Sequence, residues 1–203
     1  MNKIDIPKST KYWMDRYDNG DNSGVGSYSK MGMFKAEVLN DFVHTNNIAS
    51  VIEFGCGDGS QLSLSEYPKY IGIDVSQNAI ERCLLLFSND ETKKFELLDD
   101  HKATKCSLSI SLDVIFHLIE DFLFNDYMER LFSSAERFCI IYSSNKNAAS
   151  SCGSWHVKHR KFTDWVTANE PSWELIDIIP NKYPWNGDYR STSFCQFHIF
   201  HRK

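Results

Sequence analysis

A short apolar segment that runs directly into alternating glycines constrains this chain most. Residues 50–54 are predicted to form a buried strand, and Gly55, Gly57 and Gly59 follow it at every second position. Glycine adopts positive φ without strain and lets a ligand approach the main chain closely. A second predicted strand, residues 70–74, ends on Asp74. The pattern predicts a tight ligand-binding turn with a carboxylate beside it.

Apolar strands and helices alternate along the rest of the chain. Helical spacing of apolar residues predicts helices over residues 31–45, 122–132 and 162–166, a helix capped by Ser76, and another helix beginning after Gly59. The further predicted strands cover residues 95–98, 107–112, 138–143, 173–179 and 193–201. This alternation predicts the α/β class, with a mostly parallel, doubly wound sheet covered by helices on both faces. Ligands of such sheets bind beyond the carboxyl ends of the strands.

Length and charge narrow the function classes. The chain has 203 residues, which suits one domain over residues 1–203. Lys and Arg number 22 and Asp and Glu 27, a net charge of −5, which argues against nucleic acid as a partner. The six cysteines form no C-x-x-C pair, and neither a disulfide framework nor a metal site is predicted. No signal peptide or membrane span is recognisable, so we expect a cytoplasmic protein without a membrane partner.

The charges around the glycines bear on the ligand. A dinucleotide site of the G-x-G-x-x-G type would need glycine where Ser60 stands. Glu53 and Asp58 would also repel a pyrophosphate. A ligand that combines adenosine with a net positive end would instead be attracted, and S-adenosylmethionine has these properties.

The sequence E-F-G-C-G-D-G followed by Y-I-G-I-D resembles the glycine loop and acidic second strand of class I S-adenosylmethionine-dependent methyltransferases. The order of elements is similar from about residue 31 to residue 203, and the chain resembles the small stand-alone enzymes of this class that act on small molecules. The resemblance implies a Rossmann-like sheet of seven strands whose last strand is antiparallel. Tyr183-Pro184-Trp185 would lie between the closing pair of strands.

The same resemblance implies roles for individual residues. Glu53 would lie beneath the cofactor's ammonium group, and Asp74 would hold its ribose. Asp99 or, as the second candidate, Asp100 would reach the adenine amino group. The other residues expected to border the cofactor are Gly55, Cys56, Gly57, Gly59, Val75, Ser111 and Leu112.

Residues 1–30 resemble a lid segment that folds over the cofactor, ahead of an α/β core at residues 31–203. Tyr12 would cover the methyl-bearing end, and Arg16 would pair with the cofactor carboxylate. The alternative is an amphipathic helix that packs Trp13 and Tyr17 on the core.

Three histidines are candidates for acid–base chemistry on the acceptor. His117 follows the fourth predicted strand and is either a general base or a residue at a helix start. His156 and His159 lie in residues 155–161, which either bind a phosphate, carboxylate or sugar or form a solvated cationic loop. The D/N-P-P-Y/F sequence of amino-methyltransferases and the Pro-Cys nucleophile of cytosine C5 enzymes are both missing from the expected places.

The sequence therefore predicts an enzyme that moves a methyl group from S-adenosylmethionine to a small polar or anionic acceptor, with sugars and phosphosugars as examples. A protein or RNA methyltransferase is the first alternative. A non-catalytic subunit that only binds S-adenosylmethionine is the second. The acceptor molecule and the oligomeric state are left open.

Overall fold

The computed structural model describes residues 6–147 and 154–203 of the chain, so residues 1–5 of the predicted lid segment lie outside the described residues. The strands are β1 (Val51–Phe54), β2 (Tyr70–Asp74), β3 (Lys93–Leu97), β4 (Cys106–Leu112), β5 (Ala135–Ser143), β6 (Trp173–Ile179) and β7 (Gln196–Arg202). The α-helices are α1 (Lys8–Asp18), α2 (Ser29–Thr45), α3 (Gln77–Leu86), α4 (Asp121–Ser133) and α5 (Phe162–Asn169). Single 3₁₀ turns cover Val25–Ser27, Leu62–Leu64 and Ile115–His117. Among the described residues, no helix is both long and apolar enough to cross a membrane.

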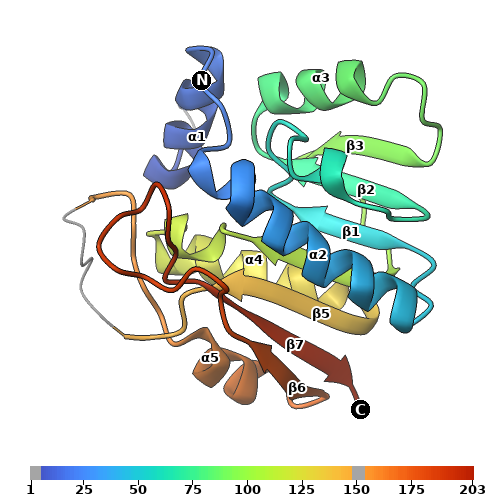
Figure 1. Cartoon of the computed structure of the whole chain (residues 1–203), viewed down its shortest axis with the longest axis vertical. Helices are drawn as coiled ribbons and strands as arrows, with labels where there is room; N and C mark the ends of the chain where they lie inside the picture. The colour runs from blue at the N-terminus through green and yellow to red at the C-terminus, as the bar shows by residue number, and fades with distance from the viewer. Residues whose placement is uncertain (1–5, 148–153) are drawn as a thin grey trace, which may run out of the picture.

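The strands form one sheet of seven with the order β3-β2-β1-β4-β5-β7-β6 (Figure 1). Neighbouring strands from β3 to β5 are parallel, whereas β7 is antiparallel to both β5 and β6. The prediction of a mostly parallel, Rossmann-like sheet of seven strands with an antiparallel last strand is confirmed. Because β7 runs backwards, its beginning lies at the edge where the parallel strands end.

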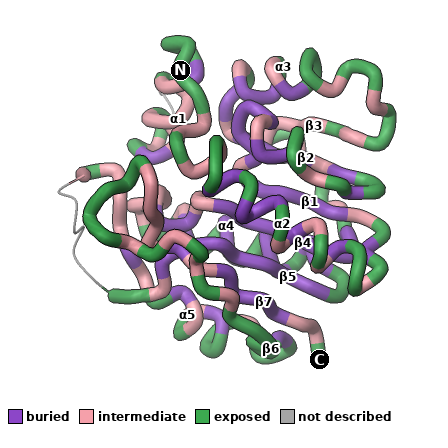
Figure 2. The backbone as a smooth tube through the Cα atoms, viewed as in Figure 1, coloured by how far each residue is buried: buried purple, intermediate pink, exposed green. Residues whose placement is uncertain are grey.

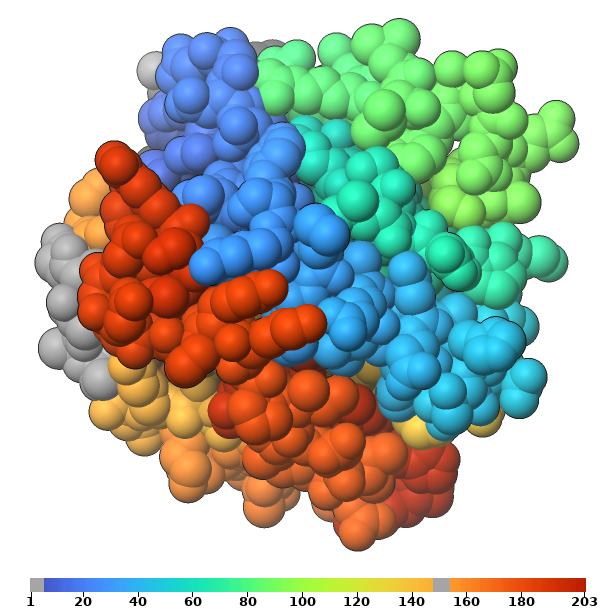
Figure 3. All heavy atoms as spheres, in the orientation of Figure 1, coloured from blue at the N-terminus to red at the C-terminus, as the bar shows by residue number. Residues whose placement is uncertain are grey.

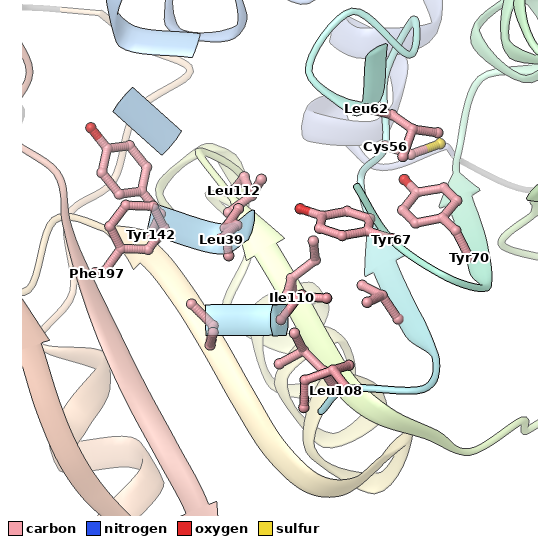
Figure 4. Packing of buried hydrophobic residues seen from close by; sticks show 14 of the residues in the cluster. Leu39, Cys56, Leu62, Tyr67, Tyr70, Leu108, Ile110, Leu112, Tyr142 and Phe197 are labelled. Atoms are coloured by element: carbon pink, nitrogen blue, oxygen red, sulfur yellow. The ribbon is translucent and has the colours of Figure 1, made fainter. Parts of the chain in front are cut away.

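Each face of the sheet carries its own hydrophobic core, and buried residues follow the central strands (Figure 2). One core joins α2 and α3 to the sheet, and Figure 4 shows part of it, with Leu39 of α2 close to Leu112 of β4 and with Tyr142 against Phe197. The second core joins α4 and α5 to the other face. Central strands are therefore buried on both sides, as parallel sheets require.

The sequence of β4 shows how one strand serves the core. Leu108, Ile110 and Leu112 alternate with serines along the strand, so these three apolar side chains share the face that α2 covers. Their spacing of two residues is the period of a strand, which explains why this element was predictable from the sequence.

The beginning of α3 is also explained by a local signal. Ser76 caps the helix as predicted, because its Oγ accepts a hydrogen bond from the backbone N–H of Ala79 at 3.3 Å. This cap fixes the point at which the chain turns from β2 into the helix.

One predicted helix does not form, and the predicted start of the last strand is wrong by three residues. Over residues 60–69, all of which the structure describes, the chain makes a 3₁₀ turn at Leu62–Leu64 and forms no α-helix. The segment is rich in serine, whose hydroxyls compete for backbone partners, and Pro68 disfavours helical backbone at the residue before it. The last strand begins at Gln196 rather than Ser193, because the chain between β6 and β7 stays irregular up to Cys195.

Candidate functional site

A cavity of about 620 Å³ opens at the edge of the sheet where the parallel strands end. Its walls come from the segments that follow β1, β2, β3 and β4, from α1 and the chain after it, from α2, and from the loop between β6 and β7. In Figure 3 the atoms of that last loop (red) lie against the N-terminal segment (blue). The cavity therefore joins parts of the chain that are far apart in sequence.

The glycine turn forms one end of the cavity. Gly55 and Gly57 both line it, with φ of +80° and +58°. A Cβ added at Gly55 would lie 2.5 Å from Cγ2 of Val114, and one at Gly57 would meet the Tyr17 hydroxyl at 2.8 Å. These positions combine left-handed backbone with close neighbours, so only glycine fits them. Cys56 lines the cavity between them.

Gly59 has a different role from the other two glycines. It is not among the described residues that line the cavity, and a Cβ there would lie 3.1 Å from the Cys83 sulfur of α3. Gly59 therefore allows α3 to approach the turn closely.

The Asp74 carboxylate lies beside the glycine turn and lines the cavity. Its Oδ2 accepts the backbone N–H of Gly57 at 2.9 Å, and its Oδ1 accepts that of Ser76 at 3.0 Å. Burial raises the pKa of Asp74 above its ordinary value, although these backbone donors oppose the rise. Val75, the next residue, also lines the cavity. The carboxylate is thus held in place and remains next to the ligand space.

Glu53 is a buried carboxyl group at the same end. It lines the cavity, is 3% exposed, and accepts a hydrogen bond from the Tyr70 hydroxyl at 2.6 Å. Burial raises the pKa of Glu53 to about 7, while the Tyr70 hydroxyl and the Lys35 ammonium oppose the rise. A cationic ligand group nearby would favour the ionised carboxylate. The glycine end is therefore suited to a ligand with a positive charge.

The two residues predicted to border the cofactor at the end of β4 differ in position. Leu112 lines the cavity. Ser111 is fully buried behind it, with its Oγ 2.7 Å from the Tyr127 hydroxyl. The side chain of Ser111 is therefore engaged with α4, on the other face of the sheet.

The two acids predicted to reach the adenine lie beyond the cavity wall. Asp99 and Asp100 are exposed, and neither is among the described residues that line the cavity, whereas Leu98 just before them is. Both acids follow the end of β3, where the chain turns and the Asp100 backbone N–H donates to the Leu97 carbonyl at 3.1 Å. Their contact with an adenine amino group stays a prediction.

The N-terminal segment lies directly on the glycine turn. Asp58 Oδ2 accepts the backbone N–H of Ser23 at 2.9 Å and the Tyr28 hydroxyl at 2.7 Å. Tyr12 and Arg16 of α1 both line the cavity. On the same helix Tyr17 is buried, as the alternative interpretation predicts, and it lines the cavity as well. Trp13, the other residue of that interpretation, is half-buried and lines the cavity too. α1 therefore forms a wall of the cavity, and its role as a lid stays a prediction.

Two of the three predicted histidines lie together in the cavity wall. The ring centres of Tyr12 and His156 are 4.6 Å apart in a stacked pair, and those of His156 and His117 are 5.5 Å apart. His117 Nδ1 lies 3.1 Å from the His156 carbonyl oxygen, and burial lowers the pKa of His117 to about 4. The His117 ring is therefore neutral near pH 7, and Nδ1 donates to the carbonyl. His159 is buried away from the cavity, with Nδ1 2.7 Å from Ser144 Oγ.

The cations of residues 155–161 do not face the cavity. Lys158 and Arg160 pair with Asp121 at 2.7 and 2.8 Å, and Lys161 pairs with Asp164 at 2.8 Å. None of the three is among the described residues that line the cavity. Their charges are engaged on the protein surface, away from the ligand space.

Sequence reasoning missed a buried ion pair in the cavity wall. The Lys35 ammonium of α2 is 2.8 Å from Asp113 Oδ2, just after β4, and Lys35 is 1% exposed. The sequence did carry a signal, because Lys35 shares the helix face of Met31 and Leu39, which are both buried. No group of three or more potential metal ligands occurs within residues 6–147 and 154–203.

Comparison with known proteins identifies the fold. No family model and no curated protein matches the sequence. Among solved structures, the N-methyltransferase NodS from Bradyrhizobium japonicum WM9 in complex with S-adenosylhomocysteine is similar at a TM-score of 0.73 and 12% identity, covering 97% of this chain and 99% of that one. Magnesium protoporphyrin IX methyltransferase from Synechocystis PCC 6803 with bound S-adenosylhomocysteine is similar at a TM-score of 0.69 and 14% identity, covering 96% and 98%.

The methyltransferase domain of the bacterial protein CtHen1-C is also similar, at a TM-score of 0.64 and 17% identity, covering 84% of this chain and 97% of that one. The chain has the Rossmann-like fold of these methyltransferase structures.

Proposed function

We propose that this protein is an S-adenosylmethionine-dependent methyltransferase that acts on a small acceptor. One observation carries the proposal: the buried carboxyl groups of Glu53 and Asp74 line the same cavity as the glycine turn. The fold and the bound ligands named for its structural neighbours support it.

The residues at the glycine end suit this cofactor. Glu53 is buried and would gain an ionic partner from the ammonium group, and Asp74 would accept the ribose hydroxyls. Arg16 lines the same cavity and would pair with the cofactor carboxylate. When bound, the cofactor supplies an activated methyl group on a sulfonium. The protein's part is to align the acceptor with that group and to exclude water.

The other end of the cavity would bind the acceptor. Two groups there are able to take a proton, the neutral His117 ring and the Asp113 carboxylate. His156 stacks on His117 and completes that wall. The remaining walls come from α1, α2, α4 and the loop between β6 and β7. A pocket of about 620 Å³ has the size of a small-molecule site, which supports a small acceptor.

The positions of the three cations in residues 155–161 help to decide between acceptor classes. Lys158, Arg160 and Lys161 are paired with carboxylates outside the cavity, which argues against a role for them in binding RNA phosphates. The prediction of an anionic acceptor depended on the same three cations. Their position outside the cavity removes the reason for which an anionic acceptor was predicted.

Calorimetry with S-adenosylhomocysteine tests the proposal. We expect one binding site per chain and no comparable binding of NAD. The acidic groups Glu53 and Asp74 in the cavity wall provide the reason, since they disfavour a pyrophosphate. Tight binding of NAD without any response to S-adenosylhomocysteine would contradict the proposed function.

A further inference from the structure

The acceptor end of the cavity contains an ion pair that is both buried and constrained. The Lys35 ammonium contacts Asp113 at 2.8 Å and lies 5.4 Å from the centre of the Tyr142 ring. Asp113 has a φ of +60°, an unusual conformation for a residue with a side chain. Strained residues and buried charges are concentrated at functional sites.

Asp113 remains open to the cavity although its partner is buried. Its side chain is 22% exposed, compared with 1% for Lys35. The backbone of the N-terminal segment lies against it, because a Cβ added at Gly26 would be 2.9 Å from Asp113 Oδ2. A ligand in this half of the cavity would therefore meet the carboxylate directly, with the ammonium behind it.

Aromatic rings line the same half of the cavity. Phe116 and Phe194 pack edge to face with ring centres 5.3 Å apart, and the Trp185 ring centre is 5.7 Å from that of Phe194. All three line the cavity, and so do Tyr12 and His156, whose rings stack on the side of α1. Such surfaces bind flat rings through stacking and burial of apolar area.

We propose that this half of the cavity binds a planar aromatic acceptor carrying a hydroxyl group, and that Lys35 and Asp113 receive that hydroxyl. The inference rests on the proposed function and names the acceptor class for the same site. A neutral hydroxyl fits the pair because it donates to the partly exposed carboxylate, which the buried ammonium behind it holds in place. A carboxylate or phosphate acceptor would instead be repelled by Asp113.

The pair also accounts for the chemistry that an aromatic hydroxyl needs. A phenolic hydroxyl has a pKa of about 10, so methylation of its oxygen at neutral pH requires a base. The hydroxyl proton goes to the Asp113 carboxylate, and the Lys35 ammonium stabilises the developing negative charge on oxygen. An oxygen lone pair then forms the new C–O bond. The C–S bond breaks and leaves its electron pair on sulfur, which gives S-adenosylhomocysteine and the methyl ether.

The test compares acceptor classes on the whole chain. Catechol, 2-naphthol and a flavonol are the aromatic probes, with glucose and glucose 6-phosphate as non-aromatic probes. Binding to protein saturated with S-adenosylhomocysteine is followed by tryptophan fluorescence, and transfer by the label of methyl-tritiated S-adenosylmethionine. We expect binding and transfer with at least one aromatic probe and with neither sugar. Transfer to the sugars, or no binding of any aromatic probe, overturns the inference.

Substitutions distinguish the role of the Lys35–Asp113 ion pair from that of charges elsewhere on the protein. Asp113→Asn and Lys35→Met should each lower kcat by about 10²–10⁴-fold, the range for losing acid–base catalysis. Asp113→Asn should lower kcat far more than it lowers the affinity for S-adenosylhomocysteine, because in the proposal its carboxylate acts on the acceptor. Lys158→Met, which removes a cation outside the cavity, should change neither kcat nor the affinity for S-adenosylhomocysteine. Full activity of Asp113→Asn overturns the proposed roles.

Two further results keep the inference testable if Lys35→Met does not fold. Phe194→Leu should raise KM for the aromatic probe with little change in kcat, because it removes only a ring from the wall. His117→Gln distinguishes the two groups that could take the proton, because an inactive His117→Gln beside an active Asp113→Asn would assign the proton to His117 and contradict the proposal. Failure of wild-type protein to bind S-adenosylhomocysteine contradicts the proposed function itself, and normal binding without aromatic binding contradicts only this inference.

Discussion

The two ends of the cavity are built in different ways. The glycine end consists of one short stretch, residues 55–57, with Glu53 before it and Asp74 at the end of the adjacent strand. The acceptor end combines side chains from α1, α2, the end of β4 and the loop between β6 and β7. The shape of the glycine end depends mainly on main-chain geometry, and that of the acceptor end depends mainly on which side chains are present. An end built mostly from backbone suits a ligand shared by many enzymes, and an end built from side chains can change with the acceptor.

The largest effect is expected where backbone geometry is disturbed. Gly57→Ala would strain a backbone with φ of +58° and push into Tyr17 and Ser23. Affinity for S-adenosylhomocysteine, measured by calorimetry, should fall by about 3 kcal/mol, the upper end of what backbone strain of this kind costs. Gly187→Ala is the matched control, because Gly187 also has positive φ but nothing lies within 4 Å of an added Cβ. Equal losses in both variants would show that the contacts at Gly57 have no special importance.

A smaller loss is expected from removing one carboxylate at the same end. Asp74→Ala should weaken binding of S-adenosylhomocysteine by about 1.5–3 kcal/mol, the range for a charged hydrogen-bond acceptor. Asp99→Ala serves as the comparison, since Asp99 is exposed and outside the cavity wall. A loss confined to Asp74→Ala would contradict the predicted contact of Asp99 with adenine. A substantial loss with Asp99→Ala would instead support its predicted contact with adenine.

The pH dependence of S-adenosylhomocysteine binding tests whether Glu53 contacts the ligand's ammonium group. In the free protein its pKa is about 7, and a cationic ligand group requires the ionised form. Binding below this pKa must displace a proton, so affinity for S-adenosylhomocysteine should fall by about tenfold for each unit of pH below the pKa and stay constant above it. Glu53→Gln should remove this dependence. Wild-type affinity that does not change across the pKa would contradict a contact between Glu53 and the ammonium group.

The smallest effect concerns the segment that covers the glycine turn. We expect bound S-adenosylhomocysteine to slow amide hydrogen exchange over residues 12–28, because the ligand adds contacts to their inner face. Asp58→Asn should weaken this protection by about 1 kcal/mol, since Asp58 accepts hydrogen bonds from Ser23 and Tyr28. Identical exchange with and without ligand would mean that the segment has only a structural role.

The glycine end could be predicted from the sequence because its determinants are local. Three glycines and an acid at a strand end can be recognised without knowing the rest of the structure. The α/β class with a mostly parallel sheet followed in the same way, from the alternation of strands and helices.

The acceptor end could not be predicted, because its partners are distant in sequence. Lys158 and Arg160 have the spacing of a binding loop, yet both pair with Asp121 in another helix. Lys35 lies on the apolar face of its helix, but its partner Asp113 lies 78 residues further along the chain. Pairing over such a separation depends on the packing of α2 against β4, which no local pattern encodes.

The placement of β7 has a consequence for how the chain folds. β7 lies between β5 and β6, although it is the last of the three in sequence. A nascent chain that has not yet released β7 therefore leaves β5 and β6 without the strand that joins them. Unpaired strand edges are templates for aggregation, and non-local pairing is slow to form. The insertion of β7 would therefore complete the sheet and, at the same time, bring the loop between β6 and β7 to the cavity. A chain that lacks β7 would then have an incomplete site.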